Sequence, residues 1–277
     1  MDAKPCGALC AAPERAEVTS HPNERIEQGS IARFFDAMAP RRNGLFRANP
    51  ILDYEQAVRS RAVLSLLKPR AGETILDIGC GNARDIVPIL RANARIVGVD
   101  ISPEMIRQGK SDLADAGFPD VELQVGDATE LEFPTGTFDA VLCSEVIEHI
   151  PDASRAIGEM FRVLRPGGRL VLSTPNRTSW YGFDRYIVWT RMLRRTWNHP
   201  FDNWRTTTEL SNLLEEQGFA VEVTRTVCYV PGFLLTYFVP PAAQRLIAAT
   251  VRYLETVASS IAPRWGYLLV VTATKTA

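Results

Sequence analysis

Residues 74–85 read Thr-Ile-Leu-Asp-Ile-Gly-Cys-Gly-Asn-Ala-Arg-Asp, and the fold assignment starts from this stretch. The apolar run before the glycines is typical of a buried strand, and Gly79 and Gly81 follow it directly. Glycines at that place let the backbone turn tightly and approach a ligand at the carboxyl edge of a sheet. Arg84 stands where a dinucleotide site needs a third small residue, and Asp77 precedes the glycines. The loop therefore favours a ligand with an ammonium group near Asp77 over a pyrophosphate.

Two further carboxylates follow the next two predicted strands. The strand at 95–99 ends at Asp100, and the strand at 121–125 is followed by Gly-Asp-Ala at 126–128. At these strand ends a carboxylate can meet ribose hydroxyls and an adenine amino group, respectively. Each acid alone is equally well explained as a helix cap or a solvated turn. Three acids at successive strand ends, around one glycine loop, predict a single adenosine-containing ligand.

Short apolar strands alternate with helical segments from residue 74 onward. This order is typical of an α/β domain in which a mostly parallel sheet has helices on both faces. After residue 173 comes an atypical stretch, and further helices and strands then complete the chain. The predicted strands are 74–78, 95–99, 121–125, 138–143, 169–173, 219–228 and 267–274, and the predicted helices are 84–92, 103–116, 152–164, 207–217 and 242–261.

The remaining segments are predicted as additions within one domain that spans 30–277. Residues 1–29 lack an apolar period and are predicted to be a disordered tail. Apolar residues at close to helical spacing predict an N-terminal helical cap over 30–69. Two insertions come later in the chain, a lid over 175–206 and an apolar helical insertion over 231–263.

Five short motifs resemble those of class I S-adenosylmethionine-dependent methyltransferases, and of the ubiquinone-biosynthesis O-methyltransferases among them. They are the loop at 77–81, Asp100, Asp127, Phe-Asp-Ala-Val at 138–141 and Leu-Arg-Pro-Gly-Gly at 164–168. The resemblance implies a Rossmann-like α/β fold with a seven-stranded, mostly parallel sheet, whose last strand is antiparallel, and S-adenosylmethionine as the cofactor. One departure is Ala83, which stands where many members have a third glycine. The resemblance implies the following cofactor-binding residues: Asp77, Gly79, Cys80, Gly81, Asp100, Ile101, Asp127, Ala128 and Ser144.

The segment after the fourth strand, Ser-Glu-Val-Ile-Glu-His at 144–149, concerns the methyl acceptor. It is similar to a Glu-Val-x-Glu-His segment of ubiquinone-biosynthesis O-methyltransferases and of small-RNA 3′-end 2′-O-methyltransferases. In both groups the resemblance implies that Glu145, Glu148 and His149 can bind Mg²⁺ or a similar ion. In the RNA group a second histidine, here matched by His199, completes the site. A metal would lower the pKa of an attacking hydroxyl. Without metal, His149 is expected to be a general base or to position the acceptor, with the two glutamates beside it.

The lid over 175–206 combines tryptophans with arginines. It holds four of the chain's five tryptophans, at 180, 189, 197 and 204, among six arginines. This composition suits a plain lid over a small substrate, a peripheral contact with membrane lipid, or stacking on single-stranded RNA. The apolar segments at 233–239 and 246–261 favour an apolar acceptor, although such a pattern is also typical of core or of a dimer interface.

Bulk composition narrows the partners and the location. The formal net charge of −1 offers no general attraction to nucleic acid, so no nucleic-acid partner is expected. Five cysteines without disulfide or zinc spacing are typical of the cytoplasm. Pro240 and Pro241 divide the most apolar stretch, which leaves no continuous membrane span there. The protein is expected in the cytoplasm, with membrane association through 175–206, and the oligomeric state is left open.

Together these patterns predict an enzyme that transfers a methyl group from S-adenosylmethionine to a hydroxyl of an apolar small molecule. The acceptor is expected to be phenol- or quinol-like, or lipid-linked. Carbon or nitrogen methylation of a secondary metabolite is the main alternative. RNA 2′-O-methylation needs a broad basic track, which the net charge does not favour. A cofactor-binding protein without catalysis is the last alternative, and the intact set of three acids argues against it.

Overall fold

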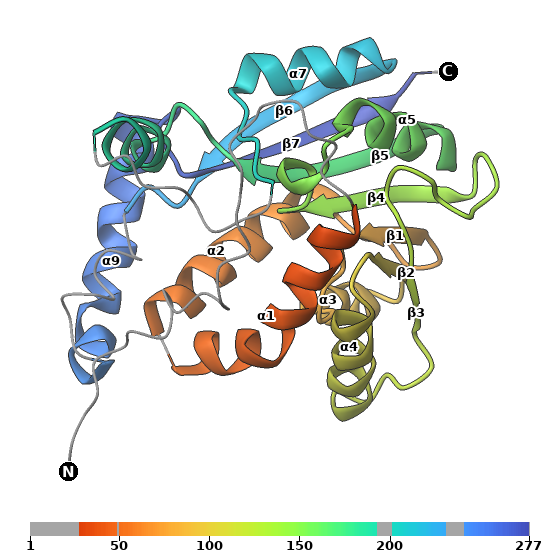
Figure 1. Ribbon diagram of the computed structural model, residues 1–277, viewed down its shortest axis with the longest axis horizontal. Helices are drawn as coiled ribbons and strands as arrows, with labels where there is room; N and C mark the ends of the chain where they lie inside the picture. The colour runs from red at the N-terminus through yellow and green to blue at the C-terminus, as the bar shows by residue number, and fades with distance from the viewer. Residues whose placement is uncertain (1–27, 49, 193–200, 231–240, 277) are drawn as a thin grey trace.

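A sheet of seven strands forms the centre of the part of the chain that the computed structural model describes, residues 28–48, 50–192, 201–230 and 241–276. The strand order is β3-β2-β1-β4-β5-β7-β6, and β7 runs antiparallel to both of its neighbours, β5 and β6 (Figure 1). The predicted Rossmann-like sheet with an antiparallel last strand is confirmed. The strands are β1 (Thr74–Ile78), β2 (Arg95–Asp100), β3 (Glu122–Val125), β4 (Phe138–Ser144), β5 (Leu164–Pro175), β6 (Phe219–Val227) and β7 (Leu268–Lys275).

Each face of the sheet has its own apolar core, because alternate residues of a strand point to opposite faces. On one face Leu76 and Ile78 of β1 pack with residues of α5 and α7. On the other face Ile75 packs with residues of α2, α3 and α4. The predicted coverage of both faces by helices is therefore confirmed. These helices are α2 (Pro50–Leu67), α3 (Ile86–Arg91), α4 (Pro103–Asp115), α5 (Ala153–Val163) and α7 (Thr207–Glu216).

Strand β5 begins earlier than the sequence pattern predicts. The predicted strand at 169–173 extends back to Leu164, which pairs with Phe138 of β4, and the register shifts between Phe138 and Ala140. Gly168 is required in this segment, because an added Cβ would lie 2.8 Å from a backbone carbonyl oxygen. The Pro-Gly-Gly segment is thus an irregular start of the strand, where the sequence alone indicates a turn.

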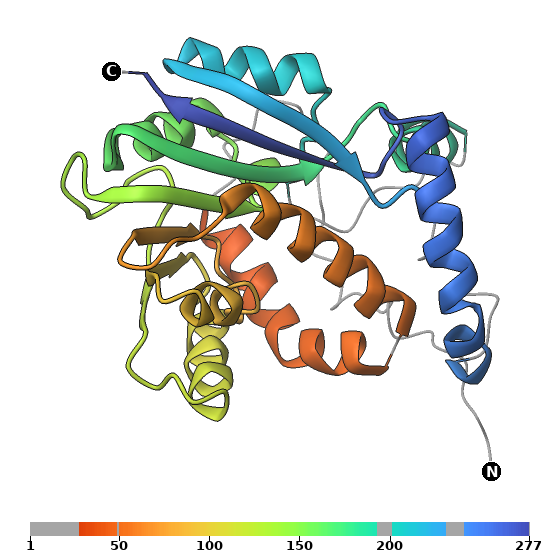
Figure 2. The ribbon, with the colours of Figure 1, turned by 180° about the vertical axis from the view of Figure 1, so that it is seen from behind.

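Two helices form the N-terminal cap. The first, α1 (Gln28–Ala48), packs against α4 and α2. The second, α2, packs against β5, β7 and α9 (Pro241–Ile261), as the view from behind shows (Figure 2). Residues 1–27 of the predicted tail lie outside the described residues.

The chain after β5 is partly helical. A short helix, α6 (Trp180–Phe183), continues into the π-helix η3 (Asp184–Met192). Residues 193–200 of the predicted lid and 231–240 of the predicted apolar insertion lie outside the described residues, and α9 accounts for most of the rest of that insertion. Among the helices that the structure describes, none is long and apolar enough to cross a membrane.

A buried ion pair fixes the end of α2 to the start of β1. Arg169 of β5 donates to both carboxylate oxygens of Glu73, at 2.8 and 2.6 Å. The same guanidinium donates to the carbonyl oxygen of Leu67, the last residue of α2, at 2.6 Å. The hydrogen bond from Arg169 lowers the pKa of Glu73 below its ordinary value. Arg169 therefore ties together the sheet and the helix that lies across it.

We expect Arg169→Met to lower the free energy of unfolding at pH 7 by about 2–3 kcal/mol, since it leaves the Glu73 carboxylate buried without its partner. The pair stabilises the fold fully above the ordinary pKa of a glutamate and loses its effect as the pH falls through the lowered pKa. The difference between wild type and variant, measured by denaturant unfolding, should therefore shrink below about pH 4.5. Arg70→Met is the matched control, because the exposed Arg70 approaches Glu73 only to 3.9 Å, and an equal loss in both variants would contradict the role of Arg169.

Candidate cofactor and acceptor site

The glycine loop after β1 needs its glycines for conformation and for space. Gly79 and Gly81 have positive φ angles of 68° and 53°, in the left-handed region that favours glycine. A Cβ on Gly79 would lie 2.2 Å from a side-chain carbon of Val146. Ala83 also has a positive φ of 63°. This backbone conformation favours glycine, which explains why many members of the family have a glycine at this position. The loop thus passes closely over the sheet edge, as predicted.

Asp100 lies at the end of β2 and joins the loop to the start of α4. Its Oδ2 accepts from the backbone N–H of Gly81 at 2.8 Å, and its Oδ1 accepts from the N–H of Ser102 at 2.9 Å. The next residue, Ile101, is half-buried in the same turn. The carboxylate is thus held at the sheet edge, where the sequence reasoning put a ribose-binding acid.

Asp127 lies at the end of β3, beside the Asp100 turn. The N–H of Gly126 donates to the carbonyl oxygen of Asp100 at 3.0 Å, which joins the two strand ends. The Asp127 side chain accepts from the N–H and the hydroxyl of Thr129, both at 2.8 Å, and Ala128 lies within this turn, half-buried. Asp100 and Asp127 therefore belong to one continuous edge, although Asp127 also closes its own turn.

A pocket opens between the glycine loop and α2. It is lined by the predicted residues Asp77, Gly79, Cys80, Gly81 and Ser144, together with Gln56, Arg59, Asn82, Arg84 and Asp85. Asp77 is only 4 % exposed, and burial, with Asp85 nearby, raises the pKa of Asp77 well above its usual range. An ammonium group in the pocket would offset this cost.

Arg59 supplies a buried positive charge to the pocket, and the sequence analysis did not identify it. It is 5 % exposed, donating to Asp85 Oδ2 at 2.9 Å and to Ser144 Oγ at 3.0 Å. Its Nε has no hydrogen-bond partner among the described residues. The sequence did contain a signal for Arg59. It precedes the buried Val63 by four residues, so both lie on the same face of α2, and a cation on a buried helix face indicates a charged partner. Arg59 and Asp77 in one pocket fit the carboxylate and the ammonium of an amino acid.

The two predicted acceptor-side glutamates are held by the hydroxyl groups of β5. Glu145 Oε1 accepts from Ser173 Oγ at 3.2 Å, and Glu148 Oε2 accepts from Thr174 Oγ1 at 3.1 Å. Burial raises the pKa of Glu145 and of Glu148 to about 8, and the charge of Glu148 adds to the shift at Glu145. Both side chains therefore favour the neutral form in the protein without ligand.

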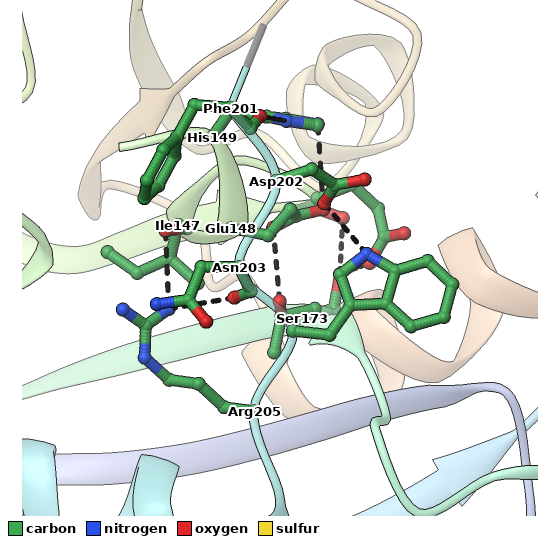
Figure 3. A network of polar contacts seen from close by, with 12 residues as sticks. Ile147, Glu148, His149, Ser173, Phe201, Asp202, Asn203 and Arg205 are labelled. Atoms are coloured by element: carbon green, nitrogen blue, oxygen red, sulfur yellow. Dashed lines mark hydrogen bonds and ion pairs between the residues drawn. The ribbon is translucent and has the colours of Figure 1, made fainter. Parts of the chain in front are cut away.

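His149 is oriented by residues 201–203, which lie near the end of the predicted lid (Figure 3). Its Nδ1 lies 3.2 Å from the carbonyl oxygen of Phe201, and the N–H of Asn203 donates to the carbonyl oxygen of Glu148 at 2.8 Å. A carbonyl oxygen only accepts, so Nδ1 carries the proton and Nε2 of the neutral ring is unprotonated. Nε2 lies 3.8 Å from Glu148 Oε1. The arrangement gives the site a basic nitrogen next to a buried carboxyl group.

Aromatic rings adjoin these glutamates. The ring of Tyr267 lies 4.9 Å from that of Tyr181 and 5.8 Å from that of Trp204. Burial, reinforced by the charge of Glu145, raises the pKa of Tyr267 well above its usual range. Tyr267 precedes Leu268, which pairs with Pro175, the residue after the Thr174 that bonds Glu148. Trp204 itself is 2 % exposed and donates to Asp202 at 2.7 Å. The side chains of Trp189 and Trp197, two other tryptophans of the predicted lid, are outside what the structure describes.

The expected metal site is not supported by the part of the chain that the structure describes. In that part no group of three or more His, Cys, Asp or Glu side chains could hold a metal ion. The carboxylate of Glu145 is engaged by Ser173 and that of Glu148 by Thr174. His199, the fourth expected ligand, lies outside the described residues. The expected ligand set of Glu145, Glu148, His149 and His199 is therefore not assembled by the residues that the structure describes.

Comparison with known proteins identifies the class that this fold and site define. Residues 76–172 match a family model described as a methyltransferase domain. The chain is 34% identical over 182 residues to a demethylmenaquinone methyltransferase of Streptomyces avermitilis, covering 65% of this chain and 72% of that protein. It is 30% identical over 216 residues to a ubiquinone biosynthesis O-methyltransferase of Xanthomonas axonopodis, covering 76% and 86%. The chain belongs to the class I S-adenosylmethionine-dependent methyltransferases.

Solved structures agree on the fold. The [4+2]-cyclase SpnF superposes with a TM-score of 0.65 at 19% identity, over 90% of this chain and 97% of that chain. A putative methyltransferase from Haloferax volcanii, solved with its activator, gives a TM-score of 0.64 at 18% identity, over 90% and 98%. The sequence-based expectations of a methyltransferase and of S-adenosylmethionine as its cofactor are confirmed.

We expect Asp100→Ala to weaken binding of S-adenosylhomocysteine by about 1.5–3 kcal/mol, because charge-assisted hydrogen bonds to hydroxyls are lost. Titration calorimetry measures this, and a thermal unfolding curve checks that the variant is folded. Asp100→Asn keeps one acceptor oxygen and should lose less. Asp115→Ala, at the far end of α4 and exposed, is the control. Unchanged affinity in a folded Asp100→Ala protein would show that the ribose lies elsewhere.

Proposed function

We propose that this enzyme methylates a hydroxyl group of an apolar, phenol- or quinol-like small molecule. The observation that carries the proposal is the orientation of His149, whose Nδ1 is held by the carbonyl of Phe201, so that Nε2, beside Glu148, is the ring nitrogen that can accept a proton. A base at this position suits an oxygen acceptor, since a hydroxyl must lose its proton as it attacks. The relative from Xanthomonas, by its name an O-methyltransferase of ubiquinone biosynthesis, supports the same acceptor class.

In this proposal the pocket beside the glycine loop holds the methionine end of the cofactor. Arg59 bonds its carboxylate, and Asp77 bonds its ammonium group, which lowers the cost of burying both side chains. Asp100 binds the ribose hydroxyls, and Asp127 lies near the adenine. S-adenosylmethionine supplies a methyl group that its positive sulfur already activates. The protein's main contribution is then to orient the acceptor oxygen.

The proton of the acceptor hydroxyl passes to Nε2 of His149 as the new oxygen–carbon bond forms and the sulfur–carbon bond breaks. The imidazolium that results lies 3.8 Å from Oε1 of Glu148, and the partial negative charge of that oxygen stabilises it. His149 afterwards releases the proton to solvent. The N–H at Nδ1 stays on the Phe201 carbonyl throughout, so the ring keeps its orientation.

The surroundings of the base favour an apolar aromatic acceptor. The rings of Tyr181, Trp204 and Tyr267 pack together, and the N–H of Asn203, the residue before Trp204, donates to the carbonyl oxygen of Glu148. Both glutamates favour the neutral form, which lowers the cost of burying an apolar ring against them. Carbon methylation of a quinone-type ring is the second candidate, because the Streptomyces relative is named a demethylmenaquinone methyltransferase.

Incubation of the purified enzyme with labelled cofactor and a catechol bearing an apolar tail tests the proposal. We expect a product that gains one methyl on oxygen, identified by fragmentation in a mass spectrometer, while a methyl on a ring carbon would favour the second candidate. His149→Ala should lower kcat about 10²- to 10⁴-fold and leave the affinity for S-adenosylhomocysteine unchanged. The same rate is expected in a chelator. A rate that collapses in chelator and returns with Mg²⁺ would replace the base by a metal site that includes His199.

We also propose that the acceptor is taken from a membrane surface through α6 and η3. Phe183 is 62 % exposed and Met192 is 70 % exposed, and exposed Arg191 lies beside them in the chain. Apolar side chains next to arginine suit the headgroup layer of an anionic bilayer. Phe183→Ser with Met192→Ser should weaken co-sedimentation with anionic vesicles about tenfold. Val125→Ser, on the exposed edge strand β3, is the control, and equal binding by all three proteins would exclude this surface.

A further inference from the structure

Helix α1 runs alongside α4, and one of its side chains completes the N-terminus of that helix (Figure 1). Asp36 Oδ1 accepts from the hydroxyl of Ser102 at 2.5 Å and from the backbone N–H of Glu104 at 3.1 Å. Ser102 is the N-cap of α4, and its Oγ accepts from the N–H of Met105 at 3.0 Å. A carboxylate is favourable at this end of a helix, where unpaired N–H groups carry partial positive charge.

The turn that Asp36 contacts is also the turn that presents the ribose-binding acid. Asp100 accepts from the N–H of Ser102 at 2.9 Å, and Ser102 is fully buried. Ser102 thus bonds Asp100 through its backbone and Asp36 through its side chain. The position of α1 and the position of the cofactor-binding turn are set by the same residue.

The neighbour of Asp36 in the chain reaches the acceptor side. The ring of Phe35 meets that of His149 edge to face, with the centroids 5.2 Å apart and the planes at 70°. Phe34 packs against Phe35 in a similar way, at 5.4 Å. Two consecutive residues of α1 therefore contact the two halves of the site, Asp36 at the cofactor turn and Phe35 at the base.

We propose that Asp36 is a positioning residue that holds α1 closed over the site and thereby seats Phe35 against His149. Loss of the Asp36 hydrogen bonds would free α1 from α4, and Phe35 would leave the histidine ring open to water. Since Phe35 packs against the His149 ring, whose side chain is 15% exposed, the position of α1 sets how an acceptor can approach that ring. The role of Phe35 in turnover rests on the proposed function of His149, whereas the attachment of α1 through Asp36 does not.

Hydrogen–deuterium exchange of the full-length protein, saturated with S-adenosylhomocysteine, tests the attachment directly. In Asp36→Ala the amides of α1 should exchange about tenfold faster than in wild type, the size expected for one charge-assisted hydrogen bond. Asp36→Asn keeps an acceptor oxygen for Ser102 and Glu104 and should fall between the two. Arg33→Ala, exposed on the same helix, should exchange as wild type does. Unchanged exchange of α1 in Asp36→Ala, or equal acceleration in α1 and α5, would overturn the proposal.

A kinetic comparison tests the consequence for the reaction. Asp36→Ala and Phe35→Ala should each raise the KM for the acceptor about tenfold with a smaller change in kcat, and the double variant should be no worse than either single variant. Additive effects would show that the two residues act independently and would contradict the positioning role. If no hydroxyl acceptor is found, the proposed function fails, but the exchange result for α1 still decides whether Asp36 holds the helix.

Discussion

The carboxylate of Asp100 joins the segments that any ligand at this sheet edge must meet. It accepts hydrogen bonds from the N–H groups of Gly81 in the glycine loop and of Ser102 at the start of α4. The backbone carbonyl oxygen of Asp100 accepts from the N–H of Gly126. Three strand ends are thus held in register by one residue. Contacts then continue from Asp100 to the acceptor side. Ser102, at the start of α4, donates to Asp36 of α1, and Phe35 of α1 packs against His149. A buried network of this kind is stable only when each member keeps its partner.

The sheet could be predicted from sequence almost completely, because each strand carries its own local pattern of apolar residues and punctuating glycines. The start of β5 is the exception. Its Pro-Gly-Gly segment indicates a turn when it is read alone, and only the pairing of Leu164 with Phe138 shows that the strand has already begun. The glycine loop and the acids at the strand ends were also predictable, since these residues follow their strands directly.

The residues that complete the site were not predictable, because their partners are distant in sequence. Arg59 meets Ser144 across 85 residues, and Asp36 meets Ser102 across 66 residues. His149 was identified from its motif, yet its protonated nitrogen is selected by Phe201, 52 residues later. Helical periodicity predicts which face of a helix is buried, but it does not predict which charged group of another element that face will contact. The complete metal site likewise required His199 to lie near Glu145 and Glu148, and such a contact between distant residues cannot be predicted from the sequence.

The antiparallel strand β7 has a consequence for how the chain is made. It lies between β5 and β6 in the sheet, and residue Arg169 of β5 pairs with Thr274, close to the C-terminal end of the sequence. Because β7 follows both β5 and β6 in the sequence, the facing edges of β5 and β6 stay unpaired until β7 has joined the sheet. Unpaired edges are templates for association with other chains. The sheet is therefore most exposed to association with other chains while β7 is unpaired, because β6 then has no neighbour among the seven strands.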